Sequence, residues 1–178
     1  METDLDVYQQ VKMGNLDRIK NFAGAHRVLY LAAEKGDTTV VKLIISMDPQ
    51  LIDRRNERMN GSTPLMAACL NTEENVEIVR FLVENGADPT LRSKKRAWGN
   101  TAFHWAAVRG AEEALKILLR KFPGGRDILD ADGQTPLQLL QSADAHNWFD
   151  KGINEDLENI DRGDSNERRE RMIQLLQA

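Results

Sequence analysis

The chain has 178 residues and a net charge of -4, with 41% hydrophobic and 29% charged residues, a composition that excludes a disordered or membrane-embedded chain. Its apolar runs fall far short of the roughly 20 residues that span a bilayer, and its acidic start predicts no secretory signal. The one cysteine, Cys69, excludes an internal disulfide, so we expect a reducing compartment: the cytoplasm, with or without the nucleus.

A nine-residue pattern recurs along the chain. A degenerate copy, AHRVLYLAA, starts at residue 25, and clearer copies read GSTPLMAAC from residue 61, GNTAFHWAA from residue 99 and GQTPLQLLQ from residue 133. The successive starts are 36, 38 and 34 residues apart. A period of this length indicates a repeat protein in which each unit packs on its neighbours.

Each copy of the pattern predicts a pair of helices. A threonine followed by a proline suits the start of the first helix, because threonine caps the first turn and proline lacks an N–H that would be unpaired there. Apolar residues at helical spacing predict the second helix within 40–45, 76–83 and 114–119. Gly36 and Gly110 lie between the paired helices, where a positive φ costs glycine little.

These residues resemble the ankyrin-repeat pattern G-x-T-P-L-H-x-A-A-x-x-G, whose second helix ends in G-A-D, as in 86–88 here. The resemblance implies an all-α solenoid of stacked helix-turn-helix units with extended loop fingers, and it covers nearly the whole chain. We predict one domain, 1–178, consisting of an N-terminal capping unit (3–24), three repeats (25–60, 61–98 and 99–132) and a C-terminal repeat (133–178).

Three segments depart from the family pattern. The turn at 71–75 is about two residues longer than the family spacing, and 123–129 replaces the G-A-D ending. In the last repeat the second helix is predicted only at 167–176, after an acidic insertion at 142–166. Because this insertion holds little apolar surface, we expect it to be exposed.

By resemblance, an ankyrin array binds through its concave side, which combines the loop tips with exposed positions of the first helices. Mapped onto this chain, that surface comprises Glu34, Lys35, Met59, Asn60, Ser62, Leu70, Asn71, Trp98, Asn100, Val108 and Arg109. We expect these side chains to be available to a protein partner.

The loop 87–98 is the strongest candidate within this surface. It carries four cations, Arg92, Lys94, Lys95 and Arg96, against one acid, and ends in Trp98. Tryptophan and arginine dominate interface energetics, so the loop predicts contact with an acidic partner surface. The alternative is a solvated charged loop with Trp98 folded against its own repeat.

Nucleic acid is a second interpretation of the same loop, because cations next to an aromatic ring suit phosphates and stacked bases. The neighbouring segment 122–132 is acidic, with Asp127, Asp130 and Asp132 against Arg126. Tracking of a phosphate backbone requires basic residues across adjacent loops. We therefore expect no nucleic-acid partner.

The residues that could support chemistry have ordinary structural interpretations. His104 stands at the histidine position of the family motif, where the ring hydrogen-bonds nearby backbone, and Cys69 replaces an alanine of a packed pair. Asp144, His146 and Asp150 could bind a divalent ion or form an acid–base pair, but they stand in the insertion without a second ligand cluster.

The sequence thus predicts a protein-binding module that acts as an adaptor, scaffold or inhibitor. We expect a protein partner, no membrane, no cofactor or metal, no enzymatic activity, and a monomer when free. Two alternatives remain: nucleic-acid binding through 92–98, and a metal-dependent activity at Asp144, His146 and Asp150.

Overall fold

The computed structural model describes residues 3–20, 22–70, 75–94, 99–142 and 162–178, with the backbone alone for 162–166. Within these ranges the chain is helical, and its only β-type pairing is an isolated bridge between Asn56 and Ser62. The elements are α1 (Asp4–Lys12), α2 (Asp17–Lys20), α3 (Ala25–Glu34), α4 (Thr38–Met47), η1 (Pro49–Leu51), η2 (Glu57–Met59), α5 (Pro64–Ala68), α6 (Val76–Glu84), α7 (Ala102–Arg109), α8 (Glu112–Lys121), η4 (Pro123–Asp127), α9 (Pro136–Gln141) and α11 (Arg162–Gln177).

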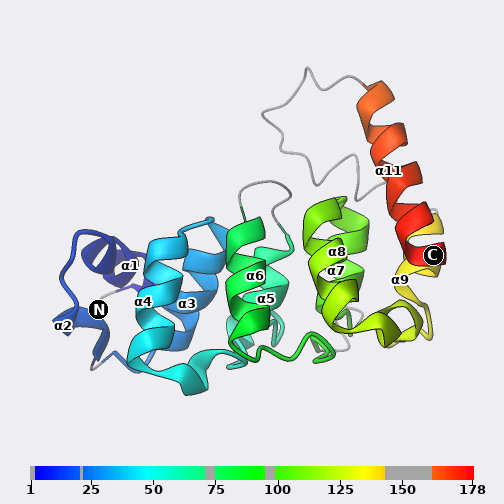
Figure 1. Cartoon of the computed structure of the whole chain (residues 1–178). Coiled ribbons are helices and arrows are strands. Elements are labelled where there is room, and N and C mark those ends of the chain that lie inside the picture. The colour runs from blue at the N-terminus through cyan, green and yellow to red at the C-terminus, as the bar shows by residue number, and fades with distance from the viewer. Residues whose placement is uncertain (1–2, 21, 71–74, 95–98, 143–161) are drawn as a thin grey trace.

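The helices stand in a row of pairs, from α1 at one end to α11 at the other (Figure 1). The first helices α3, α5, α7 and α9 pack on one another in succession, and the second helices α4, α6, α8 and α11 do the same. Two parallel layers of helices with neighbour-to-neighbour packing define an α-solenoid. The all-α solenoid predicted from the sequence is therefore confirmed.

The local signals in the sequence account for the helix boundaries. The hydroxyl of Thr63 accepts a hydrogen bond from the backbone N–H of Met66 at 3.3 Å, with Pro64 at the first helical position of α5. Gly36 and Gly110 adopt φ values of 77° and 65° between paired helices. Such a conformation is strained for residues with a Cβ atom, which is why glycine recurs at this turn.

Small residues allow the first helices to pack closely. The alanine pairs 32–33, 67–68 and 106–107 are completely buried. Asn75 strengthens the junction between two pairs by donating its side-chain amide to the carbonyl oxygen of Ala33 at 2.8 Å. The core is therefore one continuous layer between the helices rather than a central globule.

The ends of the array differ from the predicted pattern. Helix α2 has only four residues, whereas α4 has ten. The segment after Phe122 forms the short helix η4. Helix α11 begins at Arg162, five residues earlier than predicted, and buries Met172 and Leu176. Residues 143–161 of the predicted insertion and 71–74 of the long turn lie outside the described ranges.

No helix within the described ranges has the length and apolar character needed to cross a membrane.

Candidate protein-binding surface

Two loop fingers, residues 48–62 and 86–94, join into one surface. The backbone N–H of Lys94 donates to the carbonyl oxygen of Asn60 at 2.8 Å. Arg55 extends between the fingers, donating Nη1 to the carbonyl oxygen of Gly61 at 3.1 Å and to that of Arg92. These hydrogen bonds connect the two loops to each other.

Side chains add further connections between the fingers. The backbone N–H of Asp88 donates to the carboxylate of Asp53 at 3.0 Å, and Lys94 forms an ion pair with Glu57. A Cβ atom on Gly61 would lie 3.1 Å from Cγ of Lys94, so the absence of a side chain lets this lysine cross the first finger.

The joined loops present cations to solvent. Arg54, Arg58, Met59, Arg92 and Lys94 are exposed, and we call these five residues the finger surface. Neither Arg54 nor Arg92 has an ion-pair partner within the described part of the chain. Met59, with 41% of its side chain accessible, adds an apolar group among the charges.

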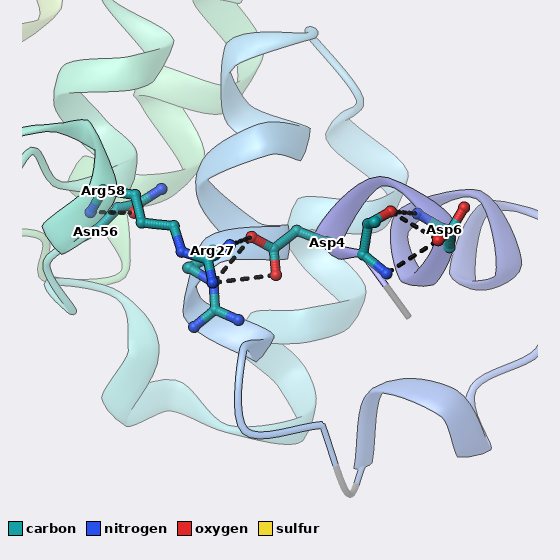
Figure 2. A network of polar contacts seen from close by, with 6 residues as sticks. Asp4, Asp6, Arg27, Asn56 and Arg58 are labelled. Carbon is teal, nitrogen blue, oxygen red and sulfur yellow. Dashed lines mark hydrogen bonds and ion pairs between the residues drawn. The ribbon is translucent and has the colours of Figure 1, made fainter. Parts of the chain in front are cut away.

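A further acid at this surface comes from the N-terminal helix. Figure 2 shows Arg27 and Arg58 both directed toward Asp4 of α1. Its Oδ2 atom lies 2.8 Å from Nε of Arg27 and 3.2 Å from Nη1 of Arg58. The pKa of the neighbouring His26 is lowered, first by burial and then by the charges of Arg27, Arg54 and Arg58. The corner where α1 meets the first finger is thus electropositive even with Asp4 in place.

The predicted site residues fall into four groups. Met59, Arg92, Lys94 and Lys35 are exposed, while Asn60, Leu70, Glu34 and Arg109 are half-buried. Asn71, Lys95, Arg96 and Trp98 lie outside the described residues. The remaining three, Ser62, Asn100 and Val108, are buried.

The expected exposure of these three residues was wrong. The carbonyl oxygen of Ser62 accepts a hydrogen bond from Asn56 at 2.9 Å, and that of Asn100 accepts one from Ser93 at 2.9 Å, so both residues hold finger backbone together. Val108 is completely buried and packs with Leu139, because α9 covers that face of α7. None of the three can contact a partner in this conformation.

The concave side carries a half-buried pair of opposite charges. Burial raises the pKa of Glu34, and the charges of Lys35 and then of Arg109 on α7 partly counteract this rise. Burial lowers the pKa of Arg109, and Glu34 opposes that shift. Burial, reinforced by Glu34, raises the pKa of Tyr30 as well. The charges of Glu34 and Arg109 therefore each offset part of the effect of burial on the pKa of the other.

The basic residues of the first finger were not among the predicted site residues. Arg54, Arg55 and Arg58 bring basic residues onto the loop next to 87–98, where only one basic loop was expected. Counting charges separately for every predicted finger would have found them. Arg27 could not have been found in this way, because its place beside the finger depends on a contact with Asp4, 23 residues away.

Two residues with potentially reactive side chains have packing roles. Nδ1 of His104 accepts from the backbone N–H of Thr101 at 3.3 Å, so Nε2 carries the proton and donates to the carbonyl oxygen of Gln134 at 3.0 Å. This backbone role was the one predicted. Cys69 is completely buried, and burial raises the pKa of its thiol to about 12. Neither group is placed for catalysis.

Asp144, His146 and Asp150, the residues of the metal hypothesis, lie outside the described ranges. Within those ranges, no group of three or more His, Cys, Asp or Glu side chains could hold a metal ion.

Two sequence profiles match the chain, one described as ankyrin repeats (3 copies) over residues 7–93 and the other as ankyrin repeats (many copies) over residues 72–119. The solenoid therefore belongs to the ankyrin-repeat family, as the resemblance predicted. Ankyrin repeats are generally protein–protein interaction modules.

Known proteins match through the same repeats. The ANK repeat-containing protein nipk-1 of Caenorhabditis elegans is 34% identical over 99 residues, covering 56% of this chain and 15% of the relative. The human transient receptor potential cation channel subfamily A member 1 is 33% identical over 92 residues, covering 52% of this chain and 8% of the relative. The palmitoyltransferase Hip14 of Drosophila melanogaster is 34% identical over 71 residues, covering 40% and 11%. The chain thus spans at most 15% of the length of these three relatives.

Proposed function

We propose that this chain binds a partner protein through the finger surface, and that the contacted region of the partner is acidic. The observation that carries the proposal is the junction of two cationic loops, fixed by Arg55 and by the backbone bond from Lys94 to Asn60. A fixed array of exposed arginines is prepared for binding, because little loop ordering is needed when the partner arrives.

The distribution of charges on the two fingers favours a protein with an acidic surface as the partner. The two fingers, residues 48–62 and 86–94, hold five cations (Arg54, Arg55, Arg58, Arg92 and Lys94) and four acids (Asp48, Asp53, Glu57 and Asp88), whereas the whole chain has a net charge of -4. A local positive region on a negative molecule orients an acidic partner during encounter. Lys95, Arg96 and Trp98 extend the same loop in sequence, and we propose Trp98 as the apolar anchor of the interface.

Nucleic acid is the competing ligand, because the cations continue over two adjacent fingers. We favour a protein because acids are interspersed among these cations and because the chain is an ankyrin-repeat protein. We propose binding without a reaction of this chain's own, since buried His104 and Cys69 serve packing.

Affinity capture with matched charge variants tests the proposal. Arg54→Glu with Arg92→Glu alters the finger surface, and Arg80→Glu with Arg120→Glu makes the same change in net charge at exposed positions on α6 and α8. Quantitative mass spectrometry should show proteins captured by the parent and the α6/α8 control but lost from the finger variant. Nuclease treatment of the lysate should leave that capture intact. Equal capture by all three chains, or capture abolished by nuclease, would contradict the proposal.

A further inference from the structure

A cavity of about 420 Å³ opens beside the finger surface, at the N-terminal end of the array. It lies where the four-residue helix α2 meets the ten-residue helix α4. The chain crosses from α2 to α3 through Phe22 and Ala23, which line the cavity together with the end of α4 and η1. The volume lies within the roughly 300–1,000 Å³ of pockets that hold small ligands.

The lining of this cavity combines apolar side chains with two exposed side chains of opposite charge, Lys20 and Asp48. Ile44 and Ile19 are buried beneath it, and Phe22 and Leu51 are half-buried at its sides. Met47 contributes an unbranched side chain that is 37% accessible. Methionine adapts its shape to different apolar groups, so the wall can close around a large side chain.

Arginines adjoin this wall. The guanidinium carbon of Arg27 lies 5.8 Å from the centre of the Phe22 ring, and a Cβ atom on Gly24 would collide with both side chains. His26 lines the cavity and is close enough to Arg27, Arg54 and Arg58 for their charges to lower its pKa. The apolar wall and the cationic corner are therefore parts of one continuous surface.

This corner already binds a carboxylate. Asp4 lies 2.8 Å from Nε of Arg27 and 3.2 Å from Nη1 of Arg58. Arg54, which is exposed and has no ion-pair partner within the described ranges, remains open to a further acid. An occupant that joins one large apolar side chain to flanking carboxylates would thus meet complementary groups on both parts of the surface.

We propose that the cavity receives a large apolar side chain from an acidic peptide segment of the partner, whose neighbouring carboxylates contact Arg54 and Arg58. This inference rests on the proposed function, because both arginines belong to the finger surface. It adds a specific anchor to the general attraction between charges.

Peptide binding to the intact chain tests the inference without a known partner. The probe is a fluorescein-labelled peptide with one phenylalanine flanked on each side by glutamates, and its control has serine in place of phenylalanine. Fluorescence polarisation should show roughly tenfold or tighter binding of the phenylalanine peptide, since a fully buried phenylalanine contributes that much. A peptide with lysines in place of the glutamates should not bind.

Two variants separate the cavity from the charges. Ala23→Trp fills the cavity from an exposed position and should abolish the preference for phenylalanine, whereas Ala178→Trp at the exposed last residue should not. Arg54→Glu should weaken both glutamate peptides by a similar factor. As a readout that needs no variant, the phenylalanine peptide should shift the amide resonances of Phe22 and His26.

The outcomes distinguish this inference from the proposed function. Equal binding of the phenylalanine and serine peptides would overturn the cavity site and leave the finger surface standing. A retained preference for phenylalanine with no effect of Arg54→Glu would overturn the acidic contact in both proposals. Failure of both glutamate peptides to bind would overturn the cavity site, while the capture experiment would still decide the proposed function.

Discussion

Replacement of Gly125 by alanine should destabilise the array, whereas replacement of the preceding Gly124 should not. A Cβ atom on Gly125 would lie 2.6 Å from Cδ1 of Phe103 and closer still to Cε1 and Cζ of that ring. A Cβ atom on Gly124 would meet nothing within 4 Å. Neither glycine has a positive φ, so the comparison isolates side-chain packing from backbone strain.

The structure sets the size of the effect. Phe103 is completely buried in α7, so its ring cannot move aside without displacing other core residues. Adding one methyl group to such a core costs about 1–3 kcal/mol. Gly124→Ala should be neutral or stabilise by up to about 1 kcal/mol, because alanine restricts the unfolded chain.

Urea unfolding followed by far-ultraviolet circular dichroism measures both variants, with the slope of the transition as a check that the same structure unfolds. We expect a lower midpoint for Gly125→Ala and a parental or higher midpoint for Gly124→Ala. If the two variants unfold at the same urea concentration, η4 does not pack on α7 as described.

Two further predictions concern buried titratable groups. Burial raises the pKa of the Cys69 thiol to about 12. At mildly alkaline pH this thiol should therefore react with a disulfide reagent only as fast as the array opens, whereas in denaturant it should react at once. Fast reaction of the native protein would contradict its burial. Burial also lowers the pKa of His104. The neutral His104 ring should therefore contribute fully to stability at pH values above the pKa of histidine in the unfolded chain, about 6.5, and this contribution should be lost as the pH falls below that value. His104→Gln should therefore show a shallower loss of stability than the parent in acid, and parallel pH profiles would refute this.

Local chemistry made most of the fold predictable. The cap from Thr63, the proline after it and the glycine turns at Gly36 and Gly110 are set by neighbouring residues, so their effects could be read directly. The spacing of the apolar residues identified the helix faces that form the core.

The failures at the site come from contacts between distant segments. Val108 looked exposed on its own helix, but α9, which begins 28 residues later, covers it. The cationic corner required Arg27 and Arg58 to meet Asp4 of α1. No periodicity predicts the short length of α2, beside which the cavity lies.

Association kinetics with a captured partner test most directly whether the finger surface meets an acidic region. Replacing Arg58, Arg92 and Lys94 with serine should slow association and weaken its dependence on salt, because screening acts beyond about 8 Å at physiological ionic strength. Truncation of Trp98 to alanine should instead speed dissociation, at a cost of about 2 kcal/mol or more. Parental association rates in the serine variant, with unchanged dependence on salt, would show that the partner binds elsewhere on the array.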